Sequence, residues 1–126
     1  MNRELCDRTK AFALRIIRLS GAMPRGREAT IMGRQVLRAG TSVGSHCREA
    51  YRSRSKPELI SKLETALQEL DETSYWLELI GESKIVSPQR LSPLIREADE
   101  LTRILVACVK TIKGLKEPKE PKEQTS

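Results

Sequence analysis

Apolar residues recur every three or four positions along four stretches of this chain, the spacing that places them on one face of an α-helix. Turn-forming and charged residues separate the stretches: "GAMPRG", "RSRSKPE" and "ESKIVSP". The patterns predict helices over about 2–20, 27–52, 56–82 and 88–113. The expected core positions are Leu5, Thr9, Phe12, Ala13, Ile16, Ile17 and Leu19, then Met32, Val36, Ala39, Val43, Cys47 and Ala50, then Leu59, Leu63, Ala66, Leu70, Thr73, Leu77 and Ile80, and finally Leu91, Leu94, Ala98, Leu101, Leu105, Cys108 and Ile112.

The third predicted helix has recognisable residues at both ends. Ser55 and Glu58 have the spacing of a capping box, which predicts a helix start at this point. Pro57 falls in the first turn, where its missing N–H costs little. At the other end, we expect Gly81 to help terminate the helix.

The start of the fourth predicted helix allows two interpretations. Ser87 and Pro88 match an N-cap and a first helical position. Pro93 then either kinks the first turns or marks, with Ser92, the true start of the helix. Gly114 is expected at the position just after the last helical turn.

Four amphipathic helices with short connections predict an all-α fold, an up-down-up-down antiparallel four-helix bundle. The expected bundle covers residues 1–114. Residues 115–126, "LKEPKEPKEQTS", are a low-complexity charged repeat, and we expect a disordered charged tail there. Aromatic residues make up only 3% of the 126 residues, so the core must be built from aliphatic side chains, which disfavours a β-sandwich.

Composition narrows the class of protein further. No apolar run approaches the roughly 18 residues that a membrane span requires. The charged N-terminus "MNRELCDRTK" lacks the apolar segment of a signal peptide, so a cytoplasmic location is expected. The three cysteines are scattered and form no Cys-x-x-Cys pair, so we expect buried thiols and neither a disulfide framework nor a zinc site. No cofactor is expected.

The net charge of +6 is distributed unevenly along the chain. Residues 24–56 carry eight Lys and Arg against two acids, whereas residues 57–82 carry one against seven. A strongly basic segment therefore precedes a strongly acidic one. A basic surface of this kind attracts polyanions, but it can also pair with an acidic surface of the same chain or of another subunit.

The basic segment concentrates its arginines on one side of the second predicted helix. Steps of three and four place Arg34, Arg38, Arg48 and Arg52 on a single face. Three interpretations stay open: a solvated face, pairing with the acids of the third helix within the chain or across a subunit contact, or a phosphate-binding stripe. The candidate nucleic-acid-binding residues are Arg34, Arg38, Arg48, Arg52, Arg54 and Lys56, the candidate acidic partners are Glu64, Glu69, Asp71, Glu72 and Glu78, and a second basic group is Arg3, Arg8, Arg15 and Arg18.

Two glycines interrupt the same helix four residues apart, Gly40 and Gly44. Glycine inside a helix costs about 1 kcal/mol relative to alanine, so both positions need a compensating reason. Close approach of a neighbouring helix to bare backbone is the expected reason. A phosphate-binding loop is excluded, because no Gly-Lys-Ser/Thr follows and no strand is predicted nearby.

Residues for catalysis are sparse. The only histidine, His46, precedes Cys47 directly, and adjacent helical residues point about 100° apart, so the pair is no ready catalytic dyad. The Glu-x-x-His pairs of di-iron bundles are missing from the sequence, which argues against that class of metal site. We therefore expect no enzyme, no catalytic residues and no metal site.

Two blocks of the sequence, "RQVLRAGTSVGSHCREAYRSRS" and "ELDETSYWLELI", resemble a family of four-helix-bundle proteins encoded in intervening sequences of bacterial large-subunit ribosomal RNA genes. The resemblance covers about residues 5–113 and extends to the accessory variability protein of diversity-generating retroelements. His46 departs from the family pattern, which usually has Asn at this position. Roles that rest on that Asn are therefore not carried over to His46.

The resemblance implies a bundle that assembles as a ring-like homopentamer and does not imply an enzyme. By analogy with the retroelement relatives, it implies an accessory protein that binds RNA or DNA through basic surfaces, with a reverse transcriptase as one partner. The alternative is an oligomeric scaffold for protein partners, in which the basic and acidic helices serve assembly. No membrane partner is expected.

Overall fold

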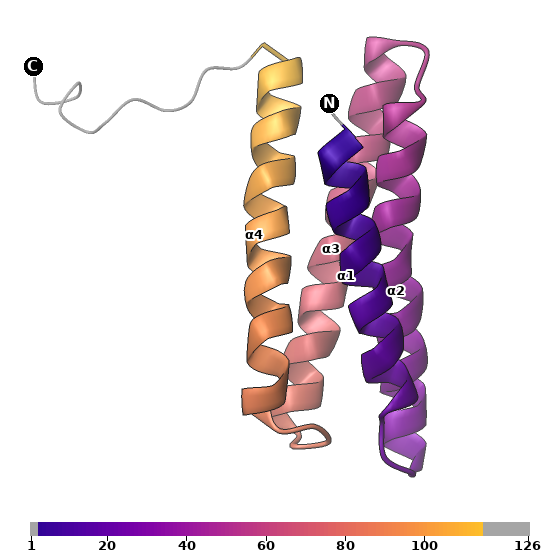
Figure 1. The fold of residues 1–126 in the computed structure, drawn as a ribbon, viewed down its shortest axis with the longest axis vertical. Coiled ribbons are helices and arrows are strands. Elements are labelled where there is room, and N and C mark those ends of the chain that lie inside the picture. Colours follow the sequence, from indigo (N-terminus) through magenta and orange to yellow (C-terminus); the bar gives the residue numbers. More distant parts are fainter. Residues whose placement is uncertain (1–2, 115–126) are drawn as a thin grey trace, which may run out of the picture.

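The computed structural model describes residues 3–114, which form four α-helices (Figure 1). They are α1 (Arg3–Gly21), α2 (Arg27–Tyr51), α3 (Lys56–Glu82) and α4 (Pro88–Ile112). Each helix runs antiparallel to the one before it, and residues 3–114 contain no strand. The predicted all-α, up-down-up-down arrangement is therefore confirmed for this part of the chain. The tail prediction concerns residues 115–126, which lie outside the described residues.

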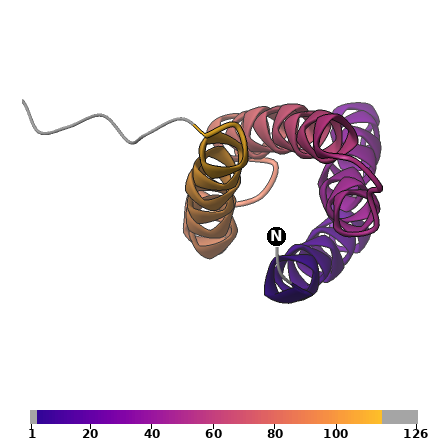
Figure 2. The ribbon, with the colours of Figure 1, turned by 90° about the horizontal axis from the view of Figure 1, so that it is seen from above.

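The four helices are arranged as an open arc rather than a closed square. Figure 2, which looks along the helices, shows α1 and α4 at the two ends of the arc, with α2 and α3 between them. Consecutive helices pack against each other along their lengths, whereas α1 and α4 make few contacts. The bundle therefore has a mouth between α1 and α4 that the sequence pattern did not predict.

The core contains the aliphatic stripes that the sequence pattern predicted, together with Phe12 and three buried residues that the pattern did not include, Ala29, Val86 and Val109. Ile17 is an exception, because its side chain is 46% exposed. It lies about 100° around α1 from Ile16, which is fully buried, and so faces away from the core. The fully buried aliphatic side chains at the centre of the bundle include Ile16, Val36, Val43, Leu63, Leu70, Leu77, Leu101 and Leu105.

The start of α3 follows the predicted capping box with one change. The Ser55 hydroxyl accepts a hydrogen bond from the Glu58 backbone N–H at 3.2 Å, as expected. The Glu58 carboxylate, however, accepts from the backbone N–H of Arg54, one residue before the cap, at 3.3 Å. The Ser55 and Glu58 side chains thus bond the backbone on both sides of the cap, which fixes the connection from α2.

Gly81 does not terminate α3, contrary to the prediction. It is buried inside the helix, which continues to Glu82. A Cβ atom at this position would lie 3.1 Å from Leu91 Cδ1, so the glycine allows α4 to approach closely. The left-handed backbone of the turn falls instead on Lys84, with φ of 63°.

The fourth helix begins at Pro88, which decides between the two predicted starts. The Ser87 hydroxyl accepts from the Arg90 backbone N–H at 3.4 Å, and Pro93 lies inside the helix. At the other end, Gly114 follows the Lys113 cap with φ of 77° and donates its N–H to the Thr111 carbonyl at 3.0 Å. The predicted role of Gly114 is therefore confirmed.

Gly40 and Gly44 allow α1 to approach the backbone of α2, as predicted. A Cβ atom on Gly40 would lie 2.8 Å from Ile16 Cγ1, and one on Gly44 would lie 3.3 Å from the Thr9 carbonyl oxygen. Both distances are shorter than ordinary van der Waals contact. The separation of α1 and α2 therefore depends on the missing side chains.

We predict that Gly40→Ala destabilises the protein, although alanine is the better helix former. The added methyl group would overlap the branched, fully buried side chain of Ile16, an overpacking cost of about 1–3 kcal/mol. Gly21→Ala is the matched control, because a Cβ atom there meets nothing within 4 Å. Urea unfolding should show a loss for the first variant and none for the second, and equal stabilities would contradict the packing role of Gly40.

Candidate nucleic-acid interface

Arg34, Arg48 and Arg52 lie exposed on the outer face of α2, as the sequence pattern predicted. Eighteen residues separate the first from the last, which corresponds to roughly 27 Å along a helix. None of the three side chains forms an ion pair with a carboxylate of residues 3–114. They form a row of cations open to solvent.

Arg38, a fourth member of the predicted stripe, has a different role. Its guanidinium donates to the carboxylates of Glu69, at 3.4 Å, and of Glu72, both on α3. The indole N–H of Trp76 also donates to Glu72, at 3.1 Å, and so fixes the position of that carboxylate. Of the three interpretations of the stripe, pairing with α3 is therefore correct for Arg38.

The remaining acids of α3 do not meet the arginines of α2. Glu64 pairs with Lys113 of α4, with a distance of 2.8 Å between Oε2 and Nζ. Asp71 and Glu78 are exposed and form no ion pair with residues 3–114. Asp71 and Glu78 therefore lie on the flank of α3 that also carries Glu64, away from the arginines of α2.

Arg54 lies in the connection between α2 and α3, Lys56 is the first residue of α3, and both are exposed. The hydrogen bond between the Arg54 backbone and the Glu58 side chain holds this connection against the first turn of α3. The two cations therefore stand at the end of α2 that carries Arg52. Together with Arg34, Arg48 and Arg52, they form the α2 basic surface.

His46 and Cys47 point to different environments, as expected for neighbours on a helix. The His46 ring nitrogen Nδ1 lies 3.0 Å from Glu49 Oε1, and Lys62 Nζ of α3 lies 3.4 Å from the same oxygen. Hydrogen bonding to His46, and then to Lys62, lowers the pKa of Glu49. Cys47 is buried in the core, where burial raises the pKa of its thiol to about 12 and keeps it protonated.

A second group of cations lies across the mouth of the arc. Arg8 of α1 forms a bidentate pair with Glu97 of α4, with 2.8 Å from Nε to Oε2 and 2.9 Å from Nη2 to Oε1. Nearby, Arg15, Arg18 and Arg90 line a pocket of about 360 Å³. The sequence placed Arg15 and Arg18 in a second basic group, but nothing in the pattern indicated that Arg90 joins them.

Neither a metal site nor a membrane span is found among the described residues. Residues 3–114 contain no group of three or more His, Cys, Asp or Glu side chains placed to hold a metal ion. Among the same residues, no helix combines the length and hydrophobicity that a membrane crossing demands.

Fold and surface together define a small four-helix protein whose polar features are arginine-rich faces on a helical scaffold. The model of the 23S rRNA-intervening sequence protein family matches residues 1–107, so the chain belongs to this family. It is similar to a solved structure described as a protein with unknown function from the S23 ribosomal protein family of Bacteroides thetaiotaomicron. The identity is 32%, with a TM-score of 0.79 and coverage of 84% of this chain and 98% of that one. No curated protein matches the chain.

We predict that the ion pair between Arg8 and Glu97 makes stability depend on pH. Hydrogen bonding to Arg8 lowers the pKa of Glu97, so the pair stabilises the fold above the unfolded pKa of about 4.3 and is lost as the pH falls through the folded value. Glu97→Gln should cost roughly 1 kcal/mol at pH 7, because the Arg8 side chain is 40% exposed and screened by solvent.

The measurement is chemical denaturation of both proteins from pH 7 down to pH 3. The difference in unfolding free energy should shrink as the pH falls, because the wild-type carboxyl group becomes protonated and loses its charge. Glu100→Gln is the control, since its pair with Arg103 lies within one helix and is more exposed. A difference that stays constant with pH would contradict this assignment.

Proposed function

We propose that this chain is a non-enzymatic accessory protein that binds the phosphate backbone of RNA or DNA through the α2 basic surface. The observation that carries the proposal is the row of cations that no carboxylate of the described chain neutralises. Arg34, Arg48 and Arg52 supply guanidinium groups along roughly 27 Å of one rigid helix. Guanidinium groups bind phosphate oxygens bidentately, which suits backbone recognition.

Binding of this kind is expected to be electrostatic and tolerant of sequence. Tyr51 is 49% exposed beside Arg52, and Tyr75 is 55% exposed on α3, but the two do not form a series of stacking platforms. The α2 basic surface therefore offers many phosphate contacts and little base readout. Structured RNA, whose shape positions phosphates at fixed spacing, is the preferred ligand class.

The family to which the chain belongs is named for 23S rRNA intervening sequences, which is consistent with a role close to RNA. The proposal includes, by analogy alone, a relation to the accessory variability protein of retroelements and a reverse transcriptase as partner. Neither the fold nor the α2 basic surface requires that particular partner.

We also propose that the chain assembles as a homopentamer. The last turns of α4 extend past the start of α1, since Arg8 near that start lies opposite Glu97. Ile104, Cys108 and Ile112 therefore line an apolar groove of about 350 Å³ that no helix of the described chain covers. Burial of this groove against a second copy would stabilise an assembly.

The alternative function is an oligomeric scaffold for protein partners in which the α2 basic surface serves assembly. The acidic flank of α3 favours this alternative, because Asp71 and Glu78 lack partners within residues 3–114 and could receive the arginines of another copy. Nucleic-acid binding requires the arginines of α2 to contact phosphate, whereas the scaffold requires them to contact another copy of the chain. Substitution of these arginines separates the two functions.

We predict that Arg34→Gln, Arg48→Gln and Arg52→Gln together flatten the salt dependence of RNA binding. Each phosphate contact on duplex nucleic acid contributes a log–log slope of roughly −0.9 on B-DNA, with the same sign on RNA. Filter binding to an RNA hairpin at several salt concentrations measures this slope. Arg38 is left intact, because its loss would leave Glu69 and Glu72 unpaired and disturb the fold.

The control replaces Arg96, Arg103 and Lys110 by Gln, which changes the net charge equally at positions on α4, away from the α2 basic surface. The control should keep nearly the wild-type slope. A triple variant of α2 that stays folded and assembled with an unchanged slope would rule out this surface. Loss of assembly together with loss of binding would favour the scaffold.

We predict a pentamer of about 71 kDa, five times the 14.2 kDa chain, in light scattering at tens of micromolar protein. Ala107→Glu should dissociate it, because it places a charge in the apolar groove of α4 at an exposed position. Gln68→Glu, on the exposed face of α3, adds the same charge outside the groove and should leave the mass unchanged. A wild-type monomer under these conditions would contradict the proposal.

A further inference from the structure

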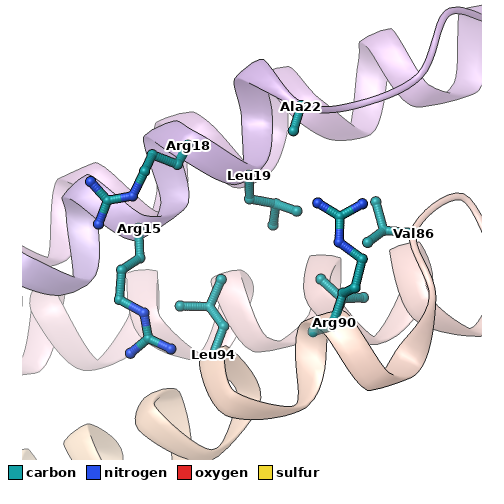
Figure 3. A pocket seen from close by; sticks show the side chains of 8 residues that line it. Arg15, Arg18, Leu19, Ala22, Val86, Arg90 and Leu94 are labelled. Carbon is teal, nitrogen blue, oxygen red and sulfur yellow. The ribbon is translucent and has the colours of Figure 1, made fainter.

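The pocket at the mouth of the arc lies between the second half of α1 and the first turns of α4. Figure 3 shows Arg15 reaching from α1 toward Leu94, and Arg90 rising from α4 toward Leu19. Arg18 lies beside Arg15 on α1, and its guanidinium group points away from Arg90. The pocket is open to solvent, and its volume of about 360 Å³ is within the range of small-molecule sites.

The charges around this pocket are all of one sign. No Asp or Glu among the described residues lines it, and Arg15, Arg18 and Arg90 make no side-chain hydrogen bond or ion pair with residues 3–114. The nearby carboxylate of Glu97 uses both oxygens on Arg8, which neutralises it. Glu97 also lies close enough to Arg15 to interact with it electrostatically, but it does not line the pocket. Three arginines therefore line one pocket that no carboxylate of the described residues lines.

The start of α4 adds to the positive potential of the pocket but supplies few backbone N–H donors. Its N-terminal end carries a partial positive charge from the helix dipole, and Arg90 lies in the first turn. The Arg90 backbone N–H is already bonded to Ser87, and Pro88 has no N–H to offer. Hydrogen bonds to a bound anion must therefore come mainly from the arginine side chains.

The floor of the pocket is apolar. Leu19 of α1 and Leu94 of α4 face it from opposite helices, and Val86 closes the end near the connection from α3. A small hydrated anion would gain nothing from this floor. An anion attached to a flat, weakly polar group would place its charge among the guanidinium groups and its carrier against the aliphatic side chains.

We propose that this pocket binds the phosphate of a single nucleotide, with the base or sugar resting on the aliphatic floor. The nucleotide is either free or the phosphorylated end of a strand, because both present the same chemistry. The site is separate from the α2 basic surface, since α1 and α4 form the ends of the arc and α2 presents its arginines on the outside. The inference therefore goes beyond the proposed function and does not depend on it.

The test is titration of the full chain with adenosine 5′-monophosphate, followed by calorimetry and by the backbone NMR signals of the pocket. Binding should move the signals of Arg15, Leu19, Arg90 and Leu94 and should saturate. Adenosine, which lacks the phosphate, should bind at least tenfold more weakly, because hydrogen bonds to charged groups contribute about 1.5–3 kcal/mol each. Equal affinities for the two ligands would overturn the proposal.

Two kinds of variant locate the binding. Replacing Arg15, Arg18 and Arg90 by Gln should weaken binding of adenosine 5′-monophosphate at least tenfold. Ala22→Glu should do the same without removing an arginine, because it brings a carboxylate to the exposed rim of the pocket. Their respective controls are the Arg96, Arg103 and Lys110 triple and Gln68→Glu. If both pocket variants bind as tightly as the wild type, the pocket is not the site.

A pair of oligonucleotides distinguishes the two sources of the nucleotide. A twelve-nucleotide RNA with a 5′-phosphate should bind more tightly than the same RNA with a 5′-hydroxyl if the pocket takes strand ends. Equal binding of the two RNAs, together with saturable binding of the mononucleotide, supports a free nucleotide as the ligand. Inorganic phosphate that binds as tightly as the mononucleotide would overturn the role of the apolar floor.

The same variants separate this inference from the proposed function. The pocket triple should keep the salt dependence of hairpin binding, and the α2 triple should keep the affinity for adenosine 5′-monophosphate. If one of these two predictions fails, the other still stands, because the pocket variant and the α2 variant share no residue and lie on different helices or faces.

Discussion

The close approach of α1 to α2 is the constraint on which the rest of the arrangement depends. Gly40 lies under the branched side chain of Ile16, and Gly44 lies under the backbone at Thr9. Side chains at these two positions would push α1 away from α2. Because α1 is held here, its opposite side carries Arg8, Arg15 and the aliphatic residues that meet α4. The mouth of the arc is thus a consequence of where α1 is fixed.

Packing of α2 against α3 decides which arginines remain available to a ligand. Arg38 and Lys62 face the neighbouring helix, where Glu69, Glu72 and Glu49 receive them. The cations farther around α2 point to solvent. The basic residues of α2 look equivalent in the sequence. The interface with α3 divides them into residues that pair with carboxylates and residues that remain exposed to solvent. The proposed nucleic-acid function rests only on the exposed residues.

The two ends of the arc combine basic and apolar features that no single helix carries. Toward the start of α4, arginines from both end helices surround an aliphatic floor. Toward its end, the helix extends past α1 and leaves an apolar groove. The bidentate pair of Arg8 and Glu97 lies between these regions and ties the end helices together. Ligand binding at one region and assembly at the other are therefore geometrically compatible.

Periodicity in the sequence was sufficient to predict the four helices, their antiparallel order, and almost every core position, because burial of an aliphatic stripe is a local property of each helix. It also identified the glycines at which helices approach closely, although Gly81 was assigned to helix termination rather than to its contact with Leu91. Ile17 is predicted in the core but is exposed in the structure. An apolar residue next to the buried stripe still fits the helical spacing, so periodicity alone does not exclude it from the core.

Only the tertiary structure decided which charges meet. Arg38 pairs with α3 while Arg34 does not, yet both belong to the same stripe in the sequence, and a rotation of about 40° around the helix separates their environments. Arg90 joins Arg15 and Arg18 across more than seventy residues of chain, through the packing of α4 on α3 and the position of α1. The sequence determines which side chains carry a charge, but the distance between two charges depends on how the helices pack.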